Sequence, residues 1–214
     1  MDVVQFKDRM KQCFGTLELP HALYYHYENA LRFDLGGEIS TALPINRFRQ
    51  AHGRACVVAQ QLFKSSKEVF LLVANDDENG PKKKRLKVLR HCGLKKAMFS
   101  PLAPEQRGAP KLTMDGPAEK RQYWDVVQLP SKSLIPDILW LSVAAELHIS
   151  PAFEGSTKSY LVDPSKGTIL HVYDDRGMDV ISKEAGQLMP LFRSHHDWLL
   201  KHDLPDMERL FNQP

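Results

Sequence analysis

ILHVYDDRGMDVI, residues 169–181, decides the fold, because a charged turn interrupts two apolar runs within thirteen residues. The pattern predicts an antiparallel hairpin in which strands at 168–174 and 178–181 are joined by the three residues Asp175, Arg176 and Gly177. Such connections often end in a glycine that adopts a left-handed backbone, which a side chain would disfavour. The sequence therefore explains Gly177 by turn geometry.

The charges of this turn admit two interpretations. Asp174 and Asp175 can accept hydrogen bonds from turn amides, and Arg176 can bind a carboxylate through two parallel hydrogen bonds. The cluster is then either a self-satisfied turn or a loop presented to a ligand or partner. A shared metal ion is disfavoured, because neighbouring residues on a strand point to opposite faces. We predict no metal site here.

Outward from the hairpin, the chain predicts a mixture of helices and strands. A second strand–turn–strand unit precedes it, in which the turn at 163–167 contains Asp, Pro, Ser and Gly. Apolar periodicity predicts helices at about 3–14, 44–63, 84–91, 133–148 and from 183, the last interrupted near Pro190, and strands at about 30–35, 69–74, 122–129 and 160–162. The predicted fold class is α+β, with a mixed, largely antiparallel sheet and a C-terminal hairpin packed against several helices.

We expect one α+β domain over residues 1–214. The segment at about 100–117 contains four prolines and two glycines, so it predicts a long surface loop without helix or strand. A chain of 214 residues, 43% hydrophobic and 26% charged, is long enough to build a core without metal or disulfide staples. The three cysteines are widely spaced and odd in number, which favours reduced thiols in the cytosol.

The N-terminus lacks the apolar core of a secretory signal, and the longest apolar run, 138–145, is too short to cross a bilayer. We therefore expect a soluble, cytoplasmic protein with no membrane partner.

The positive charge is concentrated in one segment. Eight lysines and arginines and no acid lie between residues 82 and 96, so subtracting them from the net charge of +3 leaves about −5 elsewhere. The segment lacks interleaved aromatic residues, which makes nucleic-acid binding the weaker interpretation. A solvated basic helix or a surface that docks on an acidic protein are the alternatives. The candidate binding residues are Asp174, Asp175, Arg176, Lys82, Lys83, Lys84, Arg85 and Lys87.

Other chemical candidates are weak. His52 and Cys56 have the spacing of metal ligands on a helix, but no second pair matches them, so a core histidine and a buried thiol are the simpler interpretation. Consecutive His195 and His196 diverge around a helix. The sequence holds no GxSxG, glycine-rich phosphate loop or HExxH motif. We predict no catalytic residues and no cofactor.

Several blocks carry a family resemblance: LRFDLG at 31–36, FLLV at 70–73, and above all HVYDDRGMDV at 171–180. In these blocks the chain resembles a bacterial domain-of-unknown-function family whose members are regarded as immunity proteins for Rhs-type polymorphic toxins. The motif positions are Arg32, Asp34, Tyr173, Gly177 and Asp179, and Asp34 stands where the family leads us to expect Glu.

The resemblance implies a cytoplasmic protein that binds a cognate toxin and blocks it by stoichiometric occlusion. Two alternatives remain open. One is a small cytoplasmic enzyme that uses the Asp-Asp-Arg loop with His171 or His195 as proton carrier. The other is a nucleic-acid binder that acts through residues 82–96. The sequence predicts no oligomeric state.

Overall fold

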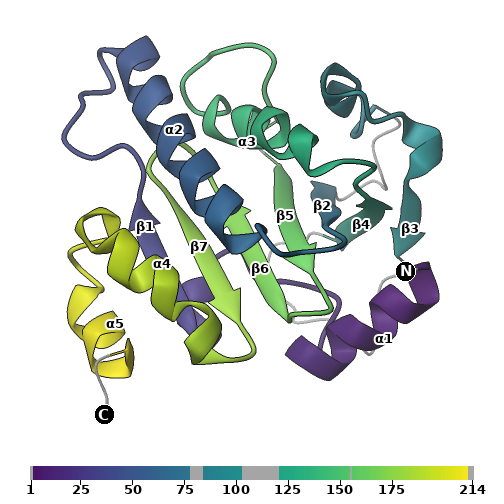
Figure 1. Cartoon of the computed structure of the whole chain (residues 1–214). Coiled ribbons are helices and arrows are strands. Elements are labelled where there is room, and N and C mark those ends of the chain that lie inside the picture. The colour runs from purple at the N-terminus through teal and green to yellow at the C-terminus, as the bar shows by residue number, and fades with distance from the viewer. Residues whose placement is uncertain (1, 78–83, 103–120, 155, 212–214) are drawn as a thin grey trace, which may run out of the picture.

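The computed structural model describes residues 2–77, 84–102, 121–154 and 156–211. Its centre is a seven-stranded sheet in the order β1-β7-β6-β5-β2-β4-β3, in which every neighbouring pair is antiparallel. The strands are β1 (Ala30–Asp34), β2 (Phe70–Asp77), β3 (Ser100–Leu102), β4 (Arg121–Gln128), β5 (Thr157–Asp163), β6 (Thr168–Val172) and β7 (Gly177–Ser182) (Figure 1).

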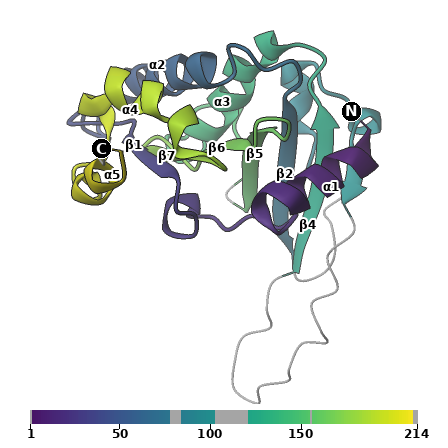
Figure 2. The same ribbon diagram turned by 60° about the horizontal axis from the view of Figure 1, so that its bottom comes forward.

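Helices cover both faces of this sheet. The α-helices are α1 (Val3–Phe14), α2 (Pro44–Leu62), α3 (Ile135–Val143), α4 (Met189–Ser194) and α5 (Leu204–Phe211). Short 3-10 helices are η1 (Leu23–Tyr25), η2 (Val88–Cys92), η3 (Lys96–Met98), η4 (Lys132–Leu134), η5 (Ala185–Gln187) and η6 (His196–Trp198). α2, α3 and α4 lie on one face and α1 on the other (Figure 2). The predicted α+β class is confirmed.

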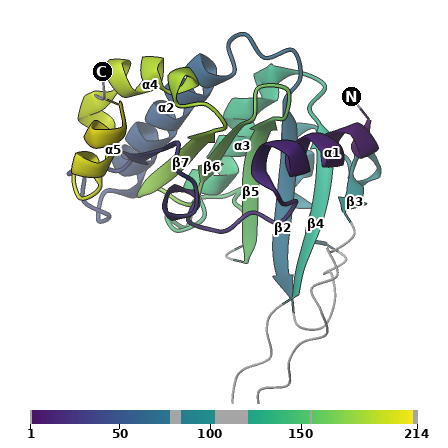
Figure 3. The ribbon, with the colours of Figure 1, turned by 90° about the horizontal axis from the view of Figure 1, so that it is seen from below.

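Alternation along the strands builds two cores. Leu31 and Phe33 of β1 face the side of α2 and α3, where they join the larger hydrophobic cluster. Phe6 and Met10 of α1 are fully buried in the second cluster, on the opposite face. Figure 3 shows α1 lying across β5, β2 and β4. Because both faces are covered, the central strands are apolar on both sides, as β2 illustrates with the buried run at 70–74.

The β6–β7 hairpin forms, but its turn is one residue longer than the sequence predicted. β6 ends at Val172, which pairs with Met178, so the connection comprises residues 173–176. The predicted left-handed conformation of Gly177 is also wrong, because Gly177 is not among the glycines with positive φ.

Close approach explains Gly177 instead. A Cβ atom at this position would lie 2.7 Å from the carbonyl oxygen of Phe33 on β1, and it would also collide with the hydroxyl of Tyr173. A side chain therefore has no room where β7 meets β1.

The turn predicted at 163–167 is confirmed, and it connects β5 to β6. Gly167 adopts a left-handed backbone with φ of 64°. The carboxylate of Asp163 accepts from the amides of Ser165 and Lys166, at 2.9 and 3.2 Å. The turn could be predicted from the sequence because the residues that form it, Asp163 and Gly167, lie within the turn itself.

Other predicted elements need correction. Ser100–Leu102 forms the edge strand β3 rather than loop, and Pro101 is tolerated because an edge strand leaves one side unpaired. The rest of the predicted loop, 103–117, lies outside the described residues. Pro190 stands in the first turn of α4, where its missing N–H has no cost, so it begins that helix rather than interrupting it. The predicted helix at 133–148 is shorter, ending at Val143. Across the described ranges, no helix has the length and apolar character needed to cross a membrane.

Candidate functional site

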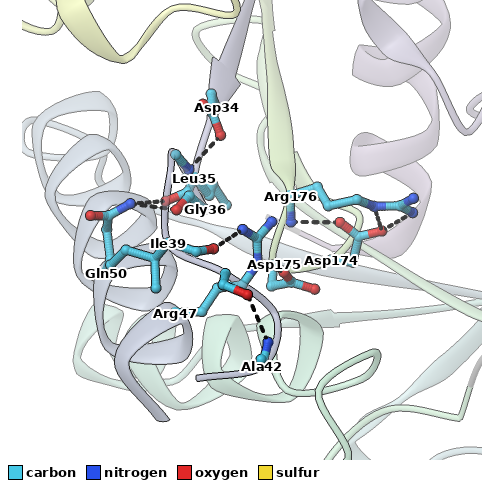
Figure 4. Close-up of polar contacts among 12 residues, drawn as sticks. Asp34, Leu35, Gly36, Ile39, Ala42, Arg47, Gln50, Asp174, Asp175 and Arg176 are labelled. Carbon is cyan, nitrogen blue, oxygen red and sulfur yellow. Dashed lines mark hydrogen bonds and ion pairs between the residues drawn. The ribbon is translucent and has the colours of Figure 1, made fainter. Parts of the chain in front are cut away.

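Asp174 and Arg176 bind each other within the β6–β7 turn. The backbone N–H of Arg176 donates to Asp174 Oδ1 at 2.7 Å, and its Nε donates to Oδ2 at 2.9 Å. Nη2 also donates to the same carboxylate, and this hydrogen bonding raises the pKa of Arg176. Asp174 is buried, whereas the Arg176 side chain is 72% exposed. The carboxylate that Arg176 binds is therefore an acid of its own turn (Figure 4), and both guanidinium hydrogen bonds go to Oδ2 rather than to the two oxygens of a bidentate contact.

Asp175 points the other way and binds α2. Its buried carboxylate forms an ion pair with Nε of Arg47, a residue of the first turn of α2. The Arg47 guanidinium also donates through Nη1 to the carbonyl oxygen of Ile39 at 2.5 Å. Gly36 packs directly on this guanidinium, and a Cβ at Gly36 would lie 2.7 Å from Nη1. The turn is thereby fastened to the helix layer.

Two further α2 side chains secure the end of β1. Gln50 Nε2 donates to the carbonyl of Gly36 at 2.6 Å, and Arg54 Nη1 donates to the carbonyl of Asp34 at 2.9 Å. Asp34 in turn accepts from the backbone N–H of Gly37 at 2.8 Å. We call Asp34, Arg47, Gln50, Arg54, Asp174, Asp175 and Arg176 the turn network.

The sequence interpretation missed the α2 side of this network. Arg47, Gln50 and Arg54 are spaced by three and four residues, which places them on one face of the helix. That spacing was the available signal. Its partners could not be read from the sequence because they lie in β1 and in a turn more than 100 residues away.

A second polar cluster lies on the α1 face of the sheet. Arg32 of β1 stands opposite Asp179 of β7, with Nε 3.6 Å from Oδ1. Nε also donates to the hydroxyl of Tyr173 at 3.4 Å, and the guanidinium lies over the Tyr25 ring, 4.9 Å from its centroid. Asp203, which follows η6, is 3.9 Å from Nε. Three of the motif positions, Arg32, Tyr173 and Asp179, thus converge in space.

Burial dominates the electrostatics of this cluster. Asp179 has no exposed surface, and desolvation raises its pKa to about 6, even though the amide of Tyr24 donates to its carboxylate at 3.1 Å. Desolvation likewise raises the pKa of Tyr173 to about 12. Within the described residues, Arg32 Nη1 and Asp179 Oδ1 have no hydrogen-bond partner. The cluster connects β1, β7 and the β6–β7 turn, but its contacts are long, at 3.4 Å for the Arg32–Tyr173 hydrogen bond and 3.6 Å for the Arg32–Asp179 ion pair.

The two histidines proposed as proton carriers form their hydrogen bonds with residues other than Asp174, Asp175 and Arg176. His171 is buried, and desolvation lowers its pKa to about 3, so it is neutral near pH 7. Its Nδ1 bonds the carbonyl of Ser159 at 2.8 Å, and Nε2 lies 3.4 Å from Nδ1 of His21. His195 stacks on Trp198 and bonds Gln61 at 2.8 Å.

His52 and Cys56 contact each other but do not assemble a site. The His52 Nε2 lies 3.4 Å from the Cys56 sulfur and 2.9 Å from the carbonyl of Pro136. In the part of the chain that the structure describes, no three His, Cys, Asp or Glu side chains come close enough to hold a metal ion.

The basic segment divides into outward and inward side chains. Lys82 and Lys83 lie outside the described residues. Lys84 and Lys87 are exposed, whereas Arg85 turns inward and forms two hydrogen bonds with the buried Asp125. The predicted helix at 84–91 is replaced by a turn followed by η2. Two surface hollows of about 660 and 470 Å³ lie along this segment, and none of Asp174, Asp175 and Arg176 lines either of them.

Comparison with known proteins identifies a family and a relative of this chain, and neither has a described biochemical activity. The chain is similar to the uncharacterized protein YnaE of Bacillus subtilis (strain 168), with 23% identity over 202 residues that cover 89% of this chain and 94% of that protein. No solved structure matches the chain. A family model described as a domain of unknown function, DUF3885, matches residues 6–203, and this span includes both the turn network and the Arg32–Asp179 pair. The chain therefore belongs to the DUF3885 family.

Proposed function

We propose that this protein is a cytoplasmic immunity protein that binds a cognate Rhs-type toxin domain and neutralises it by stoichiometric occlusion. The resemblance carried by HVYDDRGMDV at 171–180 motivates the proposal. A binding role requires a rigid, preorganised surface of about 800 Å² per partner rather than an assembled catalytic centre.

The observation that carries the proposal is the Asp174–Arg176 pair. A catalytic loop must present its acid and its cation to a substrate, yet these two side chains hydrogen-bond each other, and Asp175 is bound to Arg47. Used in this way, the motif supports a scaffold rather than a reaction centre. The enzyme alternative loses its main support, since His171 and His195 bond other partners. The proposed mechanism requires no cofactor and no metal.

The proposal predicts protection of a cell from the toxin domain encoded beside this gene. Growth of a host that expresses the toxin domain should be restored by co-expression of the full chain, and the purified proteins should form a complex of fixed stoichiometry by calorimetry. A toxin domain from an unrelated locus is the matched control and should remain lethal. Unchanged killing by the neighbouring toxin, together with no measurable heat of binding, would overturn the proposal.

A further inference from the structure

We propose that the exposed cationic side chains of residues 84–96 form the docking face for an acidic surface of the protein partner, an inference that rests on the proposed immunity function and names its contact surface. The face consists of exposed side chains from the connection between β2 and β3, which lies at the β4–β3 side of the sheet (Figure 1). We call these residues the basic ridge: Lys84, Lys87, Arg90, His91, Lys95 and Lys96.

The basic ridge is held rigidly from beneath. Leu86, Leu89, Cys92 and Leu94 alternate with the charged residues and are buried in the larger core, at 3% exposure or less. Burial of these apolar side chains is favourable at each position, so the segment is anchored along its length. The cations therefore project from a fixed backbone and lose less conformational freedom on binding than a flexible tail would.

Arg85 fixes the beginning of the ridge. Its Nε and Nη2 donate to the two carboxylate oxygens of Asp125, at 2.7 and 2.9 Å, and Asp125 lies within β4. This bidentate contact ties the segment to the sheet. The role of Arg85 in our proposal is thus to anchor the ridge rather than to contact a partner.

The outward cations of the ridge take part in few ion pairs within the described ranges. Among the described residues, no carboxylate forms an ion pair with Lys84, Lys87 or Arg90, and Glu154 is the single acid that lines the larger hollow. Arg90 lines both hollows, so the two form adjoining depressions in one positive surface. A positive surface of this kind accelerates encounter with an acidic protein and sets its orientation.

The chain favours an acidic protein over a nucleic acid. The remainder of the molecule carries about −5 charges, so a phosphate backbone extending beyond the ridge would meet repulsion. No Phe, Tyr or Trp occurs from residue 84 to 98, where His91 supplies the single ring, and single-stranded nucleic acids bind largely by stacking on aromatic side chains. A compact acidic protein patch can match the ridge without touching the acidic remainder.

A charge-reversal experiment tests this face. The ridge variant carries Lys84→Glu, Lys87→Glu and Arg90→Glu. The control variant carries Lys183→Glu, Arg193→Glu and Lys201→Glu, which are exposed cations near α4 and therefore change the net charge equally. Binding of both full-length variants to the neighbouring toxin domain is measured by calorimetry at two salt concentrations, beside a 20-base-pair DNA duplex as a second probe. Circular dichroism confirms that both variants remain folded.

The ridge variant should bind the toxin domain at least about 100-fold more weakly than wild type, because like charges brought together at an interface are strongly unfavourable. The control variant should stay within about threefold. Unchanged binding by the ridge variant, or equal weakening of both variants, would overturn the docking face while leaving the immunity function intact. Failure of the wild type to bind the toxin would remove the immunity function itself. DNA binding as tight as toxin binding, lost in the ridge variant, would assign the face to nucleic acid instead.

Discussion

Asp175 and Arg47 form a buried ion pair across 128 residues of sequence, and this pair connects the β6–β7 turn to the first turn of α2. Its neighbour Asp174 instead binds Arg176, an exposed arginine two residues along the same turn. Adjacent acids of one motif therefore serve separate structural purposes. The motif positions the helix layer on the sheet.

Removing the arginine from each of the two ion pairs should destabilise the protein by different amounts. Arg47→Ala leaves the Asp175 carboxylate buried without its cation, which should lower the free energy of unfolding by about 3 kcal/mol or more. Arg176→Ala also removes the cation of a buried acid, but Asp174 keeps its hydrogen bond from the backbone N–H of residue 176. Water can replace the lost side chain because it is 72% exposed, so the cost should be about 1 kcal/mol or less. Urea denaturation followed by circular dichroism measures both values. Equal destabilisation by the two substitutions would contradict the assignment of Asp175 as the buried anchor.

Gly177 should tolerate no side chain. Gly177→Ala forces a methyl group against the Phe33 carbonyl and the Tyr173 hydroxyl, so it should destabilise the fold by about 2 kcal/mol or more. Gly53→Ala is the matched control. Gly53 lies inside α2 with open space around it, so alanine should stabilise there by roughly 0.5–1 kcal/mol. Thermal denaturation distinguishes the two, and a neutral Gly177→Ala would show that the β7–β1 approach is not tight.

The buried Asp179 predicts a loss of stability as pH rises. Its pKa is about 6 in the folded protein compared with an ordinary value of 3.8, so folding favours the protonated carboxyl. That contribution is full below pH about 4 and disappears as pH rises through about 6. Between pH 4.5 and 7.5, wild type should lose about 2 kcal/mol of unfolding free energy relative to Asp179→Asn. A constant difference between the two proteins across this range would refute the prediction.

The buried His171 predicts the opposite pH dependence, a loss of stability as pH falls. Its pKa is lowered from 6.5 to about 3, so the folded protein keeps it neutral while the unfolded chain takes up a proton. The stabilisation is present above pH about 6.5 and should fall by about 3 kcal/mol by pH 4.5. His171→Gln should flatten this acid limb, whereas replacement of the exposed His202 by Gln should not. Proton NMR of the His171 ring provides an independent check, since a ring that titrates near pH 6 is incompatible with its burial.

Much of the secondary structure was predictable because its causes are local. The helix beginning at Pro44 follows from apolar spacing and a proline in the first turn, and the 163–167 turn follows from its own Asp and Gly. The site was less predictable. Nothing near Arg47 or Asp203 in the sequence indicates a role, because their partners Asp175 and Arg32 lie more than 100 residues away.

By itself, the sequence determined most of the helices and strands, that a charged turn lies between two apolar runs, and that the positive charge is concentrated in one segment. Side-chain periodicity, turn chemistry and charge counting depend only on neighbouring residues. Tertiary structure alone decided that Asp174 faces Arg176 while Asp175 faces Arg47, that Gly177 is required by the Phe33 carbonyl of β1, and that Arg85 turns inward. Those outcomes depend on which strands and helices become neighbours, and only packing of the whole chain fixes that.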